Sequence, residues 1–197
     1  MFTAQKTRKE NIAEYILYLW QLEDLLRALQ FSPEAIYSQL VQPSGLTEAQ
    51  KQETFLWYMD IVNLLREEGK EQQGHLEHTM HLIADLDNLH KQLLVLPIGA
   101  EYRRLYSHVA PELPKMKAKH PDISDVELFF RALYSVVLLR IQSAGKKHSK
   151  GSFTEGETAT TNSEATANSD TARQKYIDDV LSLISPVVAE LATMFRK

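Results

Sequence analysis

Along most of this chain the apolar residues recur every three or four positions, which is the spacing of α-helices. The stretch from Asn11 to Leu29, NIAEYILYLWQLEDLLRAL, is apolar on almost every side. A helix of this kind is normally buried among other helices. We therefore expect a helix from Asn11 to about Gln30 at the centre of an all-α fold, preceded by a capping box from Thr7 to Glu10. No strand pattern and no internal repeat is found.

Helix-start signals divide the rest of the chain. Ser32 with Pro33, the Thr47–Gln50 capping box and the Ser124–Glu127 capping box each stand before an apolar-periodic run. Glycines and prolines then mark where the runs end. The further helices predicted, by residue number, are 32–41, 47–68, 75–95, a short one around Tyr102 and Tyr106 followed by loop or broken helix, 125–144, and 171–197.

Composition changes sharply over residues 146–170, where Ser, Thr, Asn, Gly, Glu and Lys dominate and Phe153 is the only large apolar residue. Such a segment cannot bury enough apolar surface to offset the entropy of ordering, so we expect a disordered linker. A capping box at Thr171–Gln174 predicts that order restarts there. The expected architecture is a helical bundle of four long and two short helices. It forms one domain, with a core over 1–145 and a C-terminal helix over 171–197 docked on it.

Overall composition narrows the class of protein. The 197 residues are 44% hydrophobic and 24% charged, values typical of a soluble globular chain, and they include no cysteine for disulfides or thiolate sites. The net charge of −4 gives no general attraction to nucleic acid or to an anionic membrane. No run is apolar enough to span a bilayer or to serve as a signal sequence. We expect a cytoplasmic protein.

A few ionisable side chains fall on the apolar arcs when each helix is placed on a helical wheel. Arginine keeps its charge when buried, so an inward Arg140 requires a carboxylate partner, for which Glu23 and Glu68 are the candidates. Arg27, one turn after Glu23, could instead pair with Glu23 at the surface. The candidate inward polar cluster is Glu23, Glu68, His75, His90 and Arg140.

Two interpretations of this cluster remain open: a satisfied polar network that fixes helix register, or a metal or small-ligand site. Buried polar groups must be paired in either case. Di-iron bundles use Glu-x-x-His twice, and the nearest match here, Asp87 to His90, occurs once. His75 and His90 lie about four turns apart on one predicted helix, too far to share an ion. We therefore predict no metal and no cofactor.

Several landmarks resemble those of a family of uncharacterised bacterial proteins, known only as a domain of unknown function. They are Lys9–Tyr15, Tyr18, Trp20-Gln21, Glu23-Asp24, Trp57-Tyr58, Gly74-His75-Leu76, Leu89-His90, Leu133-Tyr134 and Leu139-Arg140. The resemblance covers nearly the whole chain except the Ser/Thr/Asn-rich segment, which departs from the family and so is expected to be dispensable. It implies an all-helical fold and no known activity.

The sequence contains no glycine-rich phosphate loop and no nucleophile elbow. It therefore favours a non-enzymatic helical module for protein interaction or self-association, containing a buried polar network. The alternative is a metal- or small-ligand-binding bundle that acts either as a binding protein or as an enzyme. Expected partners are a protein or a second copy of the chain, and neither nucleic acid nor membrane.

Overall fold

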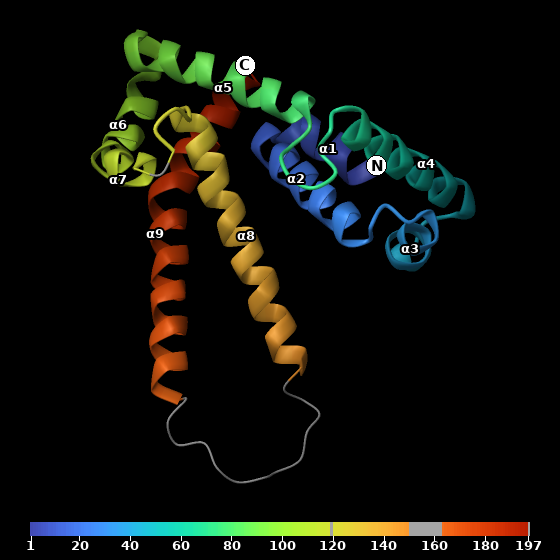
Figure 1. The fold of residues 1–197 in the computed structure, drawn as a ribbon. Coiled ribbons are helices and arrows are strands. Elements are labelled where there is room, and N and C mark those ends of the chain that lie inside the picture. The colour runs from blue at the N-terminus through green and yellow to red at the C-terminus, as the bar shows by residue number, and fades with distance from the viewer. Residues whose placement is uncertain (119, 150–162, 197) are drawn as a thin grey trace. The chain divides into compact units, whose positions relative to one another are not determined.

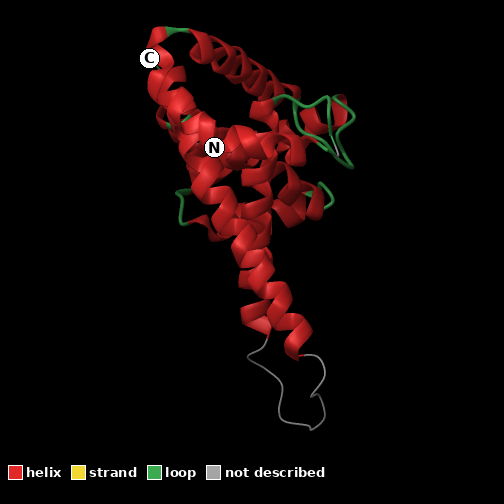
Figure 2. Cartoon of the chain, turned by 90° about the vertical axis from the view of Figure 1, so that its left-hand side faces the viewer, coloured by secondary structure: helices red, strands yellow, loops and turns green. Residues whose placement is uncertain are grey.

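A computed structural model describes residues 1–118, 120–149 and 163–196, and all regular structure in these ranges is helical (Figures 1 and 2). The all-α prediction is confirmed. None of the described helices is long and apolar enough to cross a membrane. The α-helices are α1 (Phe2–Glu10), α2 (Ile12–Ala28), α3 (Pro33–Ile36), α4 (Glu48–Glu67), α5 (Glu77–Val95), α6 (Ala100–Val109), α7 (Leu113–Lys117), α8 (Asp125–Ser149) and α9 (Ser163–Phe195).

Four shorter turns of helix join these elements. They are the π-helical η1 (Tyr37–Val41) and the 3₁₀ turns η2 (Gln42–Ser44), η3 (Pro97–Gly99) and η4 (Ala110–Glu112).

The chain forms two compact units. Unit 1 comprises residues 1–89 and 192–197, and unit 2 comprises residues 90–191. The chain passes from one unit to the other inside α5 and again inside α9. These boundaries differ from the division predicted at 145 and 171, because composition marks linkers but not a boundary that falls inside a continuous helix.

The start of the chain differs from the prediction. Thr7 does not cap the central helix: it lies inside α1, and its hydroxyl donates to the carbonyls of Thr3 and Ala4. Asn11, in an extended conformation, is the N-cap of α2, and its Oδ1 accepts from the N–H groups of Ala13 and Glu14. Asparagine is a stronger cap than threonine, and it ends α1 while starting α2.

The other predicted helix starts are confirmed at three places. Ser32 Oγ accepts from Ala35 N, the Thr47–Gln50 box is fully formed, and Ser124 Oγ accepts from Glu127 N. Gly69 and Gly74 both have positive φ in the connection between α4 and α5, which explains why glycine stands at both positions.

The core of unit 1 lies between α2, α4 and the first part of α5, with α1 packed on α2 and α3 packed on α4. The side chains that α2 buries are large, which agrees with its predicted place at the centre. The fully buried side chains of unit 1 each contribute about 1.5–3 kcal/mol by burial. They include Ile16, Trp20 and Leu26 on α2, Val62 and Leu65 on α4, and Leu86 on α5.

The core of unit 2 joins the first half of α8 to the second half of α9 and to α6. Phe129 and Phe130 on α8, Tyr102 on α6 and Leu191 on α9 are almost completely buried. Pro186 lies inside α9.

The predicted linker over 146–170 falls partly outside the described residues, which omit 150–162. At its two edges α8 continues to Ser149 and α9 begins at Ser163. Thr171 therefore lies inside α9 and does not start it. The segment 163–170 lacks apolar periodicity but contains Glu and two alanines, which favour helix, so its helicity was invisible to a search for amphipathic pattern.

Candidate functional site

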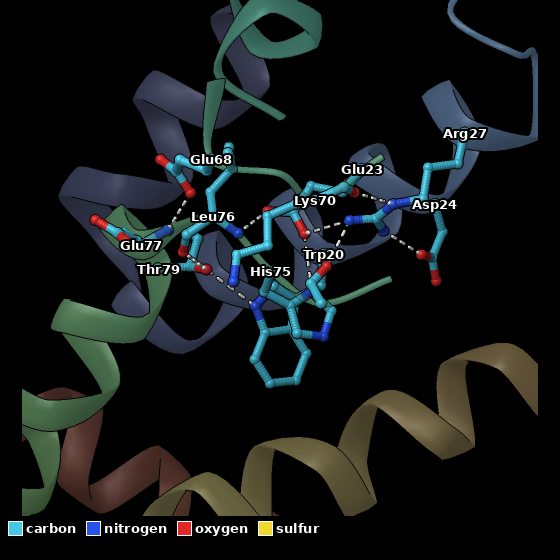
Figure 3. A network of polar contacts seen from close by, with 11 residues as sticks. Trp20, Glu23, Asp24, Arg27, Glu68, Lys70, His75, Leu76, Glu77 and Thr79 are labelled. Atoms are coloured by element: carbon cyan, nitrogen blue, oxygen red, sulfur yellow. Dashed lines mark hydrogen bonds and ion pairs between the residues drawn. The ribbon is translucent and has the colours of Figure 1, made fainter. Parts of the chain in front are cut away.

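Glu23 on α2 is the most deeply buried charged side chain described in unit 1, with 0% of its surface exposed. Its two oxygens meet the residues just before α5 (Figure 3). Oε2 lies 2.8 Å from His75 Nδ1, and Oε1 accepts from the backbone N–H of Leu76 at 3.2 Å. Glu23 therefore points inward and lies beside His75.

Arg27, one turn further along α2, supplies the nearby positive charge. Its guanidinium lies 4.0 Å from Glu23 Oε2 and donates to Asp24 Oδ1 at 2.7 Å. It also donates to the carbonyls of Lys70 and Gly74 in the connection between α4 and α5 (Figure 3). Arg27 thus holds both ends of this short connection. The guanidinium has enough N–H donors to serve three separate acceptors at once.

His75 is stacked on Trp20, with ring centroids 3.8 Å apart and planes 8° from parallel. Trp20 Nε1 donates to Thr79 Oγ1 at 3.1 Å, and that hydroxyl donates to the carbonyl of Leu76 at 2.8 Å. Each buried polar atom named here has a partner within the network, as burial demands. The arrangement fixes the start of α5 onto α2.

Glu68 sits at the edge of the same network and is half-buried. Its Oε2 accepts from the backbone N–H of Glu77 at 2.8 Å, so it caps the first turn of α5 and does not pair with an arginine. Nearby, His78 Nε2 lies 3.2 Å from the Tyr15 hydroxyl. Partial burial, followed by the charges of Arg8 and His81, lowers the pKa of His78 against a smaller opposing effect of Glu68.

His90 belongs to unit 2 and has a separate set of neighbours. It is 4% exposed, and its Nδ1 lies 2.6 Å from the hydroxyl of Tyr102 on α6. Its Nε2 lies 3.8 Å from Asp125 Oδ2, which is too long for a hydrogen bond. His75 and His90 therefore serve two different networks, in agreement with their expected separation along one helix.

Asp125, the first residue of α8, is the charged centre of this second network. It accepts from the Tyr106 hydroxyl at 2.7 Å and forms an ion pair with Lys117. Burial raises the pKa of Asp125, but the hydrogen bonds from Lys117 and Tyr106 and the charges of Lys117 and His90 outweigh it and lower that pKa overall. Burial, followed by the same carboxylate, raises the pKa of Tyr106.

Arg140 is exposed, so its predicted burial was wrong. The helical wheel gave its direction correctly relative to Phe129 and Val136, but burial along α8 stops at Val136 and none of the described side chains from Val137 to Ser143 is buried. The apolar arc of a helix is shielded from solvent only along the length that another element covers. The buried carboxylate Glu23 has Arg27 beside it instead.

The sequence patterns did not indicate the groups around His90. Tyr102 and Tyr106 were assigned only to a short helix, although their i, i+4 spacing places both rings on one face. Asp125 was recognised only as part of a cap, and Lys117 was placed in loop or broken helix. Within residues 1–118, 120–149 and 163–196, no group of three His, Asp or Glu side chains is arranged to hold a metal ion.

Comparisons with known proteins give one family. Neither the curated proteins nor the solved structures contain a match to the chain. A family model described as a domain of unknown function, DUF4924, matches residues 1–161 and so covers most of the chain, including both polar networks. The chain therefore belongs to the DUF4924 family.

Proposed function

We propose that this protein is a non-enzymatic helical module that binds another protein molecule, either a partner or a second copy of itself. The supporting observation is an exposed apolar turn at the end of α5, formed by Val95, Leu96, Pro97 and Ile98. Val95 is 79% exposed and Ile98 is 67% exposed. Contiguous exposed apolar side chains typically mark interaction sites.

This apolar turn is held rigidly. Arg103 Nη1 donates to the carbonyl of Leu93 at 2.9 Å and to that of Leu96 at 2.6 Å. Gly99 packs so closely on the backbone of Leu93 that a Cβ there would overlap it. Because the turn is already ordered, binding through it would lose little conformational entropy.

The polar networks support the same proposal, because their geometry is that of structural fastening. Glu23 orders the connection before α5, and Asp125 joins α8 to α6 and α7 through Tyr106 and Lys117. As part of this proposal we expect the protein in the cytoplasm, where a chain without cysteine needs no disulfides.

The test is to place a photoreactive benzoyl-phenylalanine at position 98, with position 25 as a control, since Leu25 is also exposed but lies outside the turn. We expect one discrete adduct from position 98 and none from position 25. Sedimentation should show that V95S/I98S loses any self-association of the wild type. A chain that sediments as a monomer at all concentrations and gives no adduct specific to position 98 would refute the proposal.

A further inference from the structure

The outward side of α4 carries a second apolar surface of different character. Its residues are Glu53, Leu56, Asp60, Leu64 and Glu67, and all five are exposed. Leu56 is 57% exposed and Leu64 is 44% exposed. At 100° per residue the five positions fall within an arc of about 80°, so they form one continuous line, which we call the outer face of α4.

The outer face is not required for packing within unit 1. The side chains that α4 buries, among them Ile61, Val62 and Leu65, point to the opposite side of the helix. Figure 1 shows that α4 continues as an unbroken helix along this length. A solvated helix face is ordinarily polar, so two leucines in one line between acids are a pattern that packing does not explain.

The three carboxylates of the outer face lie seven residues apart along α4. In the part of the chain that the structure describes, none of Glu53, Asp60 and Glu67 forms an ion pair or hydrogen bond. The cations of α4 point elsewhere: Lys51 pairs with Glu48, and Arg66 lies over the ring of Phe31. The face therefore alternates acidic residues with leucines, and its charges are all negative.

We propose that the outer face of α4 binds a basic amphipathic helix of a partner protein. Leucines of such a helix would cover Leu56 and Leu64, while its lysines or arginines would meet the three acids. The acids span 14 residue steps, about 21 Å of helix, which suits side-by-side packing of two helices. Two copies of this face would place like charges against each other, which disfavours its self-association.

This inference rests on the proposed function, but it concerns a surface separate from the apolar turn and can be tested separately. The probe is a dye-labelled Leu/Lys peptide with leucines at helical spacing. A scrambled peptide of the same composition is the control, and binding is followed by fluorescence anisotropy. Because the pairing charges are exposed, affinity should fall as ionic strength rises from about 0.05 to 0.5 M.

Charge reversal provides the decisive comparison. E53K/D60K/E67K should weaken peptide binding about 30- to 100-fold at low salt, since three exposed attractions become repulsions. E71K/D85K/D122K changes the net charge of the protein equally at exposed positions off the face, and should weaken binding less than about threefold. L56S/L64S removes apolar area that the peptide would bury, so it should weaken binding at least about tenfold. This loss should not depend on salt.

The apolar-turn variant V95S/I98S separates the two proposals. It should leave peptide affinity unchanged while abolishing the self-association expected of the turn. Equal binding of ordered and scrambled peptides, or equal loss in both charge-reversal variants, would overturn the inference about α4. If the turn experiment fails while peptide binding stays specific to the outer face, the proposal about the turn is refuted and the inference about α4 stands.

Discussion

Replacing Glu23 with leucine should destabilise unit 1 by about 3–4 kcal/mol. The change removes the acceptor for His75 Nδ1 and leaves the buried N–H of Leu76 unpaired, which costs about 1–3 kcal/mol by itself. Arg27 keeps Asp24, Lys70 and Gly74 as partners, so its charge is not stranded and the total stays below that of a fully broken buried pair.

Replacing the same residue with glutamine should cost only about 1–2 kcal/mol. The amide oxygen can still accept from Leu76 N–H, and the amide NH₂ can donate to His75 when that ring carries its proton on Nε2. What is lost is the negative charge facing the guanidinium 4.0 Å away. The comparison therefore separates hydrogen-bond satisfaction from charge.

Tryptophan fluorescence during urea unfolding is the suitable assay, because the two tryptophans, Trp20 and Trp57, both lie in unit 1. For an m value of about 2 kcal/mol/M, the leucine variant should lower the midpoint by about 1.5–2 M. Gln21→Leu, exposed on the same helix, is the control and should change stability by less than about 0.5 kcal/mol. A Glu23→Leu variant with the same urea midpoint as Gln21→Leu would refute this account of Glu23.

Four more substitutions have expected outcomes. Thr54 Oγ1 is the one buried side-chain oxygen among the described residues without a hydrogen-bond partner, so Thr54→Val should stabilise by up to about 1 kcal/mol. Thr79→Val removes the hydroxyl that accepts from Trp20 Nε1–H and should destabilise by about 1–3 kcal/mol in the same urea assay. Asp125→Asn should cost about 1 kcal/mol at neutral pH by circular dichroism; because the folded pKa of Asp125 lies below its ordinary 3.8, the cost should shrink as pH falls below about 4, and a pH-independent cost would contradict the ion pair. Gly99→Ala should disturb the apolar turn and abolish photo-crosslinking from it, and an unchanged adduct would show that the close backbone contact can relax.

Local signals predicted much of this fold. Ser32, Thr47 and Ser124 each cap the helix expected of them, because capping depends only on residues within one turn. The capping-box pattern was misleading at Thr7, where Asn11 forms the cap, and at Thr171, which lies within α9. A pattern of four residues cannot reveal a better cap nearby or a helix already under way.

For the candidate site, the sequence predicted which way a side chain faces on its own helix, but not its partners on other helices. The wheel found Glu23 and His90 because each lies on a helix face that another element covers, whereas His75 lies just before α5 and meets Glu23 from the connection. The wheel failed for Arg140, because it cannot tell where along α8 that cover ends. The partners Tyr102 and Asp125 come from other helices, and their meeting with His90 is a property of tertiary packing that no single helix encodes.

Because both passages between the units fall inside helices, neither unit corresponds to an uninterrupted stretch of sequence ending in a loop. Trimming the last six residues, which looks like removal of a tail, would take from unit 1 the buried Ala192 and the Arg196 side chain that donates to the carbonyl of Glu10. A protease that cleaves exposed loops would likewise find none at either passage, so dissecting this molecule requires cuts chosen from its three-dimensional structure.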